Sequence, residues 1–247
     1  MADTIPALSP AEKKANAARL EAEAALALAE ARKAAAEAEI VENNLRGELI
    51  RVNKLVEDEE ARHATDENNH VYRFEGSVSG ESVTKCMAKL TQWHRQDPEC
   101  TIEVIFSSPG GSIFDGMKLF DFIVELGNAG HKTITGGIGM AASMAGILVQ
   151  AGQHRYVTRE NWFLIHRAAF GAMGSTYQVE DTVELIKRIE KRIIEIFTSR
   201  SGGKLTAARI KRNWERKDWW LSSDECLELG LVDEVRSLPG TGTAEGA

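Results

Sequence analysis

The spacing of apolar and polar residues predicts a long, polar helix at the start of the chain. Half of residues 11–38 are alanine, and most of the others are Glu, Lys, Arg or Leu, which are strong helix formers. Ser9, Pro10 and Glu12 have the pattern of a helix start, with a capping serine, a proline at the first helical position and a glutamate that can complete a capping box. We therefore predict a helix that buries little of its surface.

A second stretch of this helical region carries an apolar stripe. Over residues 41–56 apolar side chains recur every three or four positions, which places them on one helix face. Gly47 interrupts the pattern, and the stripe is too short to be stable alone in water. We interpret residues 10–38 as a solvated spacer and residues 41–56 as a coiled-coil or docking helix. The stripe consists of Val41, Leu45, Leu49, Val52 and Val56.

Two polar and acidic runs, at residues 57–60 and 66–69, break the helical pattern and indicate a linker. The sequence thus predicts a helical extension with its linker over residues 1–66 and a globular domain over residues 67–237. Residues 238–247 are rich in Gly and Thr, and we expect a flexible tail there.

Within the domain, short β-branched runs alternate with amphipathic stretches, which predicts an α/β fold with crossover connections and a largely parallel sheet. Expected strands lie at residues 71–74, 101–106, 133–135 and 162–165. Expected helices lie at residues 80–96, 113–127, 142–151, 176–200 and 204–214, with a glycine-rich turn at 136–139.

Composition and charge exclude several classes of protein. The chain has 247 residues, of which 43% are hydrophobic, so it can bury a substantial core. The net charge is −7, and residues 1–63 alone hold nine basic and thirteen acidic side chains, which argues against a nucleic-acid partner. The apolar run at residues 140–149 is far shorter than the ~20 residues of a membrane span. No signal peptide is visible, and we expect a cytoplasmic protein without membrane contact.

The cysteines give no sign of a metal site or a disulfide framework. Cys86, Cys100 and Cys226 form no CxxC pair and are odd in number. We expect them to be buried as small hydrophobic residues, and we expect neither a metal nor a cofactor.

Three segments carry candidate chemistry, and each also has a purely structural interpretation. Ser143 lies among small residues before an apolar helix, where it is either an exposed nucleophile or a helix cap. Gly110 and Gly111 follow an apolar strand, where adjacent glycines either present N–H groups to an anion or form a plain turn. His166 ends another apolar strand, as a base or as a core histidine.

The order and spacing of these segments resemble the Clp protease proteolytic subunit, a family of serine peptidases. The resemblance covers roughly residues 70–236 and rests on four blocks in the family's order. It implies the α/β fold shared by that family and the crotonases, built from repeated β-β-α and βαβ units and here preceded by the long helical extension. The blocks are Ser108-Pro109-Gly110-Gly111, Gly139-Met140-Ala141-Ala142-Ser143-Met144, Ile165-His166, and Leu221-Ser222-Ser223-Asp224-Glu225-Cys226 running to Gly230-Leu231-Val232-Asp233.

By this resemblance, Ser143 corresponds to the family's nucleophile and His166 to its general base. The family's acidic member lies three residues before the Leu-Ser pair, which is Asp218 here. Asp224 and Asp233 are nearby, but Asp233 lies in the closing block and Asp224 falls inside a helix start that a capping box explains.

The resemblance also implies an oxyanion hole and a segment that contacts the substrate. The backbone N–H groups of Gly111 and Met144 correspond to the oxyanion hole, with Gly110 and Ser112 in the segment that binds the substrate backbone. No metal takes part in this chemistry.

The family comparison implies an endopeptidase that acts on polypeptides inside a homo-oligomeric chamber of stacked rings, in which residues 176–200 form the contact between rings. The charged extension leaves a partnership with an ATP-driven unfoldase open, because family members usually begin with a short flexible segment. One version of this endopeptidase hypothesis is a phage head-maturation protease, with the extension as a scaffold or tether inside a prohead. The alternatives are an acyl-CoA enzyme of the crotonase-like fold and a catalytically silent assembly subunit.

Overall fold

The computed structural model of the chain describes residues 9–215 and 217–237. The chain divides into two compact units, Met1–Ala64 and Thr65–Ala247. The expected tail at residues 238–247 lies outside the described residues.

The first unit contains helix α1 (Pro10–His63). The predicted start is confirmed, because the Ser9 side chain accepts a hydrogen bond from the Glu12 N–H and the Glu12 carboxylate accepts one from the Ser9 N–H. The predicted break at residues 57–60 is wrong, since the helix continues to His63. Glutamate favours helices, and Glu59 forms ion pairs with the side chains one turn further on. No residue of Pro10–His63, all of which are described, is buried.

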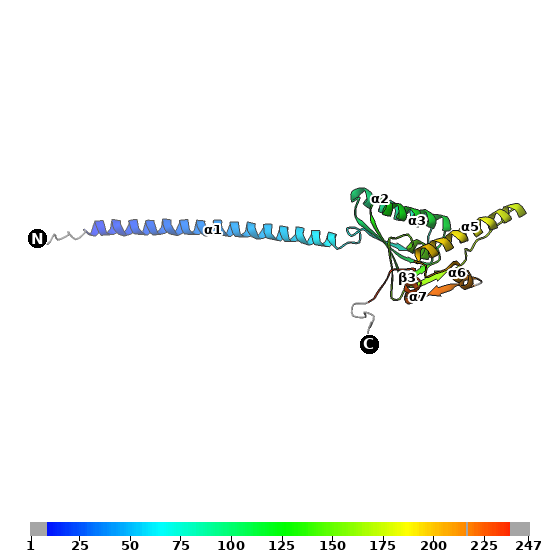
Figure 1. Cartoon of the computed structure of the whole chain (residues 1–247). Helices are drawn as coiled ribbons and strands as arrows, with labels where there is room; N and C mark the ends of the chain where they lie inside the picture. Colours follow the sequence, from blue (N-terminus) through cyan, green and yellow to red (C-terminus); the bar gives the residue numbers. More distant parts are fainter. Residues whose placement is uncertain (1–8, 216, 238–247) are drawn as a thin grey trace, which may run out of the picture. The chain divides into compact units, whose positions relative to one another are not determined.

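The second unit is built on a seven-stranded sheet of the described residues (Figure 1). Five strands lie in the order β1-β2-β3-β4-β7 and pair in parallel, β5 pairs in parallel with β3, and β6 pairs antiparallel with β5. The predicted α/β class is confirmed, whereas three of the strands, β4, β6 and β7, were not predicted. The strands are β1 (Val71–Glu75), β2 (Thr101–Ser108), β3 (Lys132–Ala142), β4 (His154–Thr158), β5 (Trp162–Ile165), β6 (Trp219–Leu221) and β7 (Glu234–Arg236).

Helices α2 and α3 lie side by side (Figure 1), and α3 and α4 both contact β3. The core between helices and sheet is aromatic and aliphatic, with Phe74, Phe106, Phe163 and Phe197 each at most 2% exposed. All three cysteines are buried, as predicted, and none of the three forms a disulfide. The helices are α2 (Gly80–Gln96), α3 (Ile113–Asn128), α4 (Met144–Val149), α5 (Thr176–Arg200), α6 (Ala207–Trp214) and α7 (Ser223–Glu228).

Strand β3 replaces the predicted glycine-rich turn. Gly136 and Gly137 are strand residues. Position 136 has no room for a side chain, because a Cβ there would lie 2.1 Å from the Tyr156 ring that packs over it. The strand pairs with β4 up to Gly137 and with β5 from Met140, and Gly139 between them has a φ of 68°. The glycines therefore allow one strand to change partners, and the helix that follows has only six residues.

Candidate active site

Ser143 and His166 meet because they follow two neighbouring strands at the same edge of the sheet. Strands β3 and β5 run in parallel with Ala142 opposite Leu164, so the next residues along lie at one end of the pair. The Ser143 N–H donates a hydrogen bond to the Leu164 carbonyl at 3.0 Å. The Ser143 Oγ lies 2.6 Å from the His166 Nε2. The two side chains thus share a short hydrogen bond.

The backbone of Ser143 is strained, which is typical of a residue whose side chain is held in position for a function. Its φ of 56° and ψ of −121° are rare for a residue with a Cβ. Ser143 stands at the N-cap of α4, yet its side chain makes no capping hydrogen bond. The hydroxyl contacts His166 instead. Ser143 therefore lies at the cap position of α4, but its side chain does not act as a cap.

The glycine loop after β2 packs against the Ser143 turn. Gly110 has a φ of 93°, and a Cβ there would lie 2.7 Å from both the Ala142 carbonyl oxygen and the Ser143 Cβ. Val78 holds the loop from the other side, because its N–H donates to the Gly110 carbonyl and its carbonyl accepts from the Ser112 N–H, each at 2.8 Å. Neither of these bonds uses the Gly111 N–H.

A cleft of about 290 Å³ opens at this contact and contains both Ser143 and His166. Met144 begins α4, so its N–H has no acceptor within the helix. The cleft is lined by Pro109, Gly111, Ile113, Ser143, Met144, Ile147, Leu164, Ile165, His166, Arg167, Ala168, Ala169, Ile193 and Phe197.

Asp218 directly precedes β6. Strands β5 and β6 are antiparallel with Ile165 opposite Trp219 as the last pair, so His166 and Asp218 are the residues that follow and precede that pair. Between these two described residues the structure contains no hydrogen bond, and Asp218 is exposed. Asp224 pairs instead with Arg159 at 2.5 Å on the surface.

Asp233 is engaged with the buried side chain of Arg155. Its carboxylate accepts hydrogen bonds from the Arg155 Nη2 at 2.5 Å, Nε at 3.0 Å and backbone N–H at 2.9 Å. Burial raises the pKa of Asp233, but the hydrogen bonds and charge of Arg155 outweigh burial and hold this pKa below its ordinary value. Asp233 therefore has a structural partner that explains its place in the closing block.

Sequence patterns did not point to the ion pair beside His166. Arg167 donates two hydrogen bonds of 3.0 Å to Glu190 of α5, whose side chain is 11% exposed. This pair fastens the residue after His166 to α5. No motif marks it, since the partners are 23 residues apart and only the tertiary fold brings them together.

A serine and a histidine in contact, beside a glycine loop and a helix start, form an arrangement typical of the serine-hydrolase class. A model of the Clp protease family matches residues 58–238, which include every candidate site residue and leave most of α1 outside. The chain therefore belongs to the Clp protease family and is a serine-type endopeptidase.

Curated relatives match the same part of the chain. An ATP-dependent Clp protease proteolytic subunit 1 from Leifsonia xyli is 35% identical over 161 residues, covering 64% of this chain and 79% of that protein. A proteolytic subunit 2 from Tropheryma whipplei is 31% identical over 163 residues, covering 65% of this chain and 87% of its own length. A subunit 2 from Cutibacterium acnes is 29% identical over 171 residues, covering 68% and 78%. Among the described residues, no helix is long and apolar enough to cross a bilayer.

Proposed function

We propose that this endopeptidase cleaves peptide bonds with Ser143 as nucleophile, His166 as general base and Asp218 as the acid that orients the histidine. The observation that carries the proposal is the 2.6 Å contact between the Ser143 Oγ and the His166 Nε2. His166 accepts the hydroxyl proton as the oxygen attacks the scissile carbonyl, and then passes it to the leaving amine. Asp218 fixes the histidine tautomer and stabilises the imidazolium once substrate orders the site.

The negative oxygen of the tetrahedral intermediate is held, in this proposal, by the N–H groups of Gly111 and Met144. Both line the cleft beside Ser143, and both N–H groups lack a partner in the local loop and helix bonding described above. Two such donors directed at the developing charge stabilise it, and the loss of one commonly costs about 2.7–4 kcal/mol of transition-state stabilisation.

The loop residues on either side of Gly111 are proposed to shape the cleft. The Gly110 N–H donates to the Ser108 Oγ at 3.1 Å and the Ser112 N–H donates to Val78 at 2.8 Å, so both donors are already engaged. We therefore propose that Gly110 and Ser112, expected in the segment that binds the substrate backbone, also fix the loop that presents Gly111.

A homo-oligomeric chamber is the proposed setting, as is usual for this family, whose members act on polypeptides. Support comes from α5, where Tyr177 and Leu185 are 79% and 46% exposed in the single chain. Exposed apolar side chains on a long helix are suited to a subunit contact. The relatives' names include dependence on ATP. Hydrolysis by Ser143 itself consumes none, so an ATP-driven partner would act on the substrate before it reaches the cleft.

The contact between Ser143 and His166 disfavours the two other classes considered. A crotonase-like acyl-CoA enzyme needs only paired N–H groups, and a silent assembly subunit needs no base beside a strained serine.

More specifically, we propose that the enzyme acts inside a viral prohead with α1 as a tether. The feature that favours it is α1 itself, which is unburied along its length and lies mostly outside the family match.

The test compares Ser143→Ala with Ser199→Ala, an exposed serine on α5. We expect Ser143→Ala to lose fluorophosphonate labelling and to hydrolyse casein and short peptides at least about 10⁴-fold more slowly. Ser199→Ala should keep both activities, and both variants should elute like wild type in size-exclusion chromatography. Cleavage by Ser143→Ala at the wild-type rate would overturn the proposal.

A further inference from the structure

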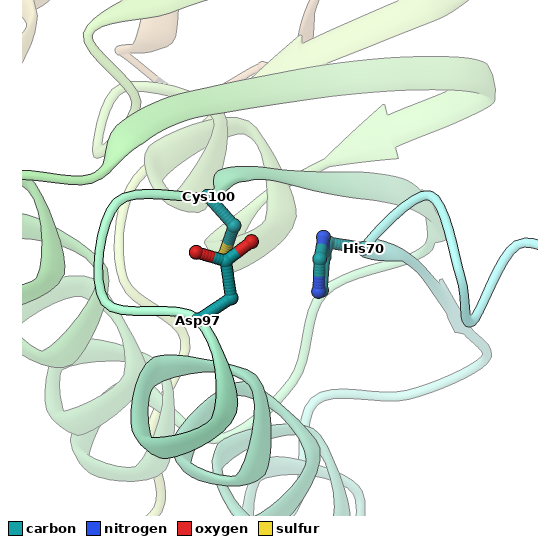
Figure 2. Close-up of side chains that lie close together, drawn as sticks. All are labelled: His70, Asp97 and Cys100. Atoms are coloured by element: carbon teal, nitrogen blue, oxygen red, sulfur yellow. The ribbon is translucent and has the colours of Figure 1, made fainter.

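Three metal-ligating side chains converge at the end of the domain where β1 and β2 begin. The ligand atoms of His70, Asp97 and Cys100 all lie within 4.8 Å of one another. Figure 2 shows the three side chains close together, each extending from a different backbone position. Cys100 is 7% exposed, His70 is partly buried and Asp97 is open to solvent.

The fold produces this convergence through two neighbouring strand starts and one helix end. Asp97 is the C-cap of α2, and the tight turn that follows returns the Cys100 N–H to the Asp97 carbonyl at 3.3 Å. His70 directly precedes β1, and its carbonyl accepts a hydrogen bond from the Glu103 N–H of β2 at 3.0 Å. Parallel pairing of β1 with β2 therefore keeps the histidine beside the turn that carries the other two side chains.

We propose that His70, Asp97 and Cys100 bind a single zinc ion, with solvent at the fourth position. Imidazole nitrogen, thiolate sulfur and carboxylate oxygen are the three donor types that zinc takes in proteins. Bonds of about 2.0–2.3 Å arranged as a tetrahedron separate ligand atoms by about 3.3–3.7 Å. The observed cluster reaches that spacing by shifts of about 1 Å or less, which rotation of the exposed Asp97 side chain supplies in part.

The backbone at His70 supports the proposal independently. His70 and Ser143 are the two non-glycine residues with positive φ in the described part of the chain, and His70 has a φ of 54°. Such strain is maintained where the side chain has a task, as it is at the proposed nucleophile. The His70 ring also stacks edge-on against Trp93, with centroids 5.5 Å apart, which limits its rotation.

Two further histidines hold the buried side of the cluster. The His131 Nδ1 lies 3.0 Å from the Cys100 carbonyl oxygen and 3.5 Å from its Sγ. The His94 Nδ1 lies 2.7 Å from the His131 Nε2. His131 is 1% exposed, so this chain of contacts fixes Cys100 from inside the protein. Outer contacts of this kind orient ligands in metal sites.

The cluster lies away from the proposed catalytic residues. His70 and Cys100 precede β1 and β2, whereas the Gly110 loop and Ser143 follow β2 and β3, so the two sites lie at opposite ends of parallel strands. A zinc ion here would fasten the start of β1 to the α2–β2 turn. Peptide hydrolysis would not require the ion directly.

The test uses the full chain, stripped with a chelator and titrated with Co²⁺ alone as a spectroscopic substitute for Zn²⁺. We expect one Co²⁺ per chain, a thiolate-to-cobalt charge-transfer band, and displacement of that band by Zn²⁺. Zn²⁺ should also raise the Tm of the chelator-treated wild type. A wild type that gives no thiolate band, or no rise in Tm with Zn²⁺, overturns the proposal.

Variants separate this site from chance binding. Cys100→Ala should lose the band, while Cys226→Ala, a matched buried cysteine, should keep it. Asp97→Asn changes only an exposed side chain, so it should fold and bind Co²⁺ at least ~10-fold more weakly. A band that persists in Cys100→Ala, or that disappears in Cys226→Ala, overturns the assignment, as does wild-type affinity in Asp97→Asn.

Discussion

The backbone of Gly110 lies so close to the side chain of Ser143 that a Cβ at position 110 would be 2.7 Å from the Ser143 Cβ. The loop that presents the Gly111 N–H and the turn that presents the hydroxyl are therefore packed as one unit. A shift of either one changes the distance between the nucleophile and the proposed oxyanion donor.

Gly110→Ala is expected to lower kcat/KM for a short peptide by at least about 100-fold, since misplacement by about 1 Å in an active site can cost that much. Gly203→Ala is the matched control, because Gly203 also has positive φ, at 85°, and a Cβ there meets nothing within 4 Å. Both variants carry backbone strain, and only the first disturbs Ser143. Equal activity of the two would show that the close contact has no catalytic consequence.

Asp218→Asn is expected to lower kcat by about 10²–10⁴-fold through loss of the correct histidine tautomer. Asp224→Asn removes only an exposed ion pair with Arg159, worth at most about 1 kcal/mol of stability, and should leave kcat unchanged. The measurement is kcat for the steady-state hydrolysis of one peptide by both variants. A larger loss in Asp224→Asn than in Asp218→Asn would assign the acid to Asp224.

Asp233→Asn is expected to reduce the free energy of unfolding by about 3 kcal/mol at neutral pH, because it leaves the Arg155 charge buried without its partner. This value is at the low end for such pairs, since the Asp233 side chain is 37% exposed. The pKa of Asp233 is lowered in the folded state. Its stabilisation is therefore complete above the unfolded pKa of about 3.9 and is lost as the pH falls toward the folded value.

Denaturant unfolding of wild type and Asp233→Asn across this acidic range provides the measurement. The difference in stability between them should shrink as the pH drops below about 4. A difference that stays constant from neutral to acidic pH would mean that the carboxylate charge contributes nothing.

A chain that begins at Thr65 is expected to fold and to hydrolyse short peptides like the full-length protein. It keeps the ion pairs of Asp66 with Arg73 at 2.6 Å and of Glu67 with Lys89 at 2.8 Å. A chain that begins at Asn68 loses both pairs, and should have a slightly lower Tm, since exposed pairs contribute about 0.2–1 kcal/mol each. Aggregation of the Thr65 chain would show that α1 is needed for folding.

Sequence patterns identified the elements around the site better than the contacts within it. The order of the four sequence blocks indicated Ser143 and His166. Their contact, however, depends on the pairing of β3 with β5, which local sequence does not encode. Gly136 was misinterpreted because its reason for being small is the Tyr156 ring, 20 residues away. His70 and Cys100 are likewise separated by 30 residues and follow no metal-binding spacing, so only the parallel pairing of β1 and β2 reveals them.

Strand β3 changes partners along its length, so the two proposed catalytic residues follow strands that are held by ladders of different size. Ser143 continues β3, the central strand of the five parallel strands β1-β2-β3-β4-β7. His166 continues β5, which is held by three residue pairs to β3 and three to β6. Phe163 and Ile165 of β5 are at most 2% exposed, so this short ladder is also held by the core. The distance between the proposed base and nucleophile therefore depends on the packing of three strand residues against the core, as well as on the main sheet.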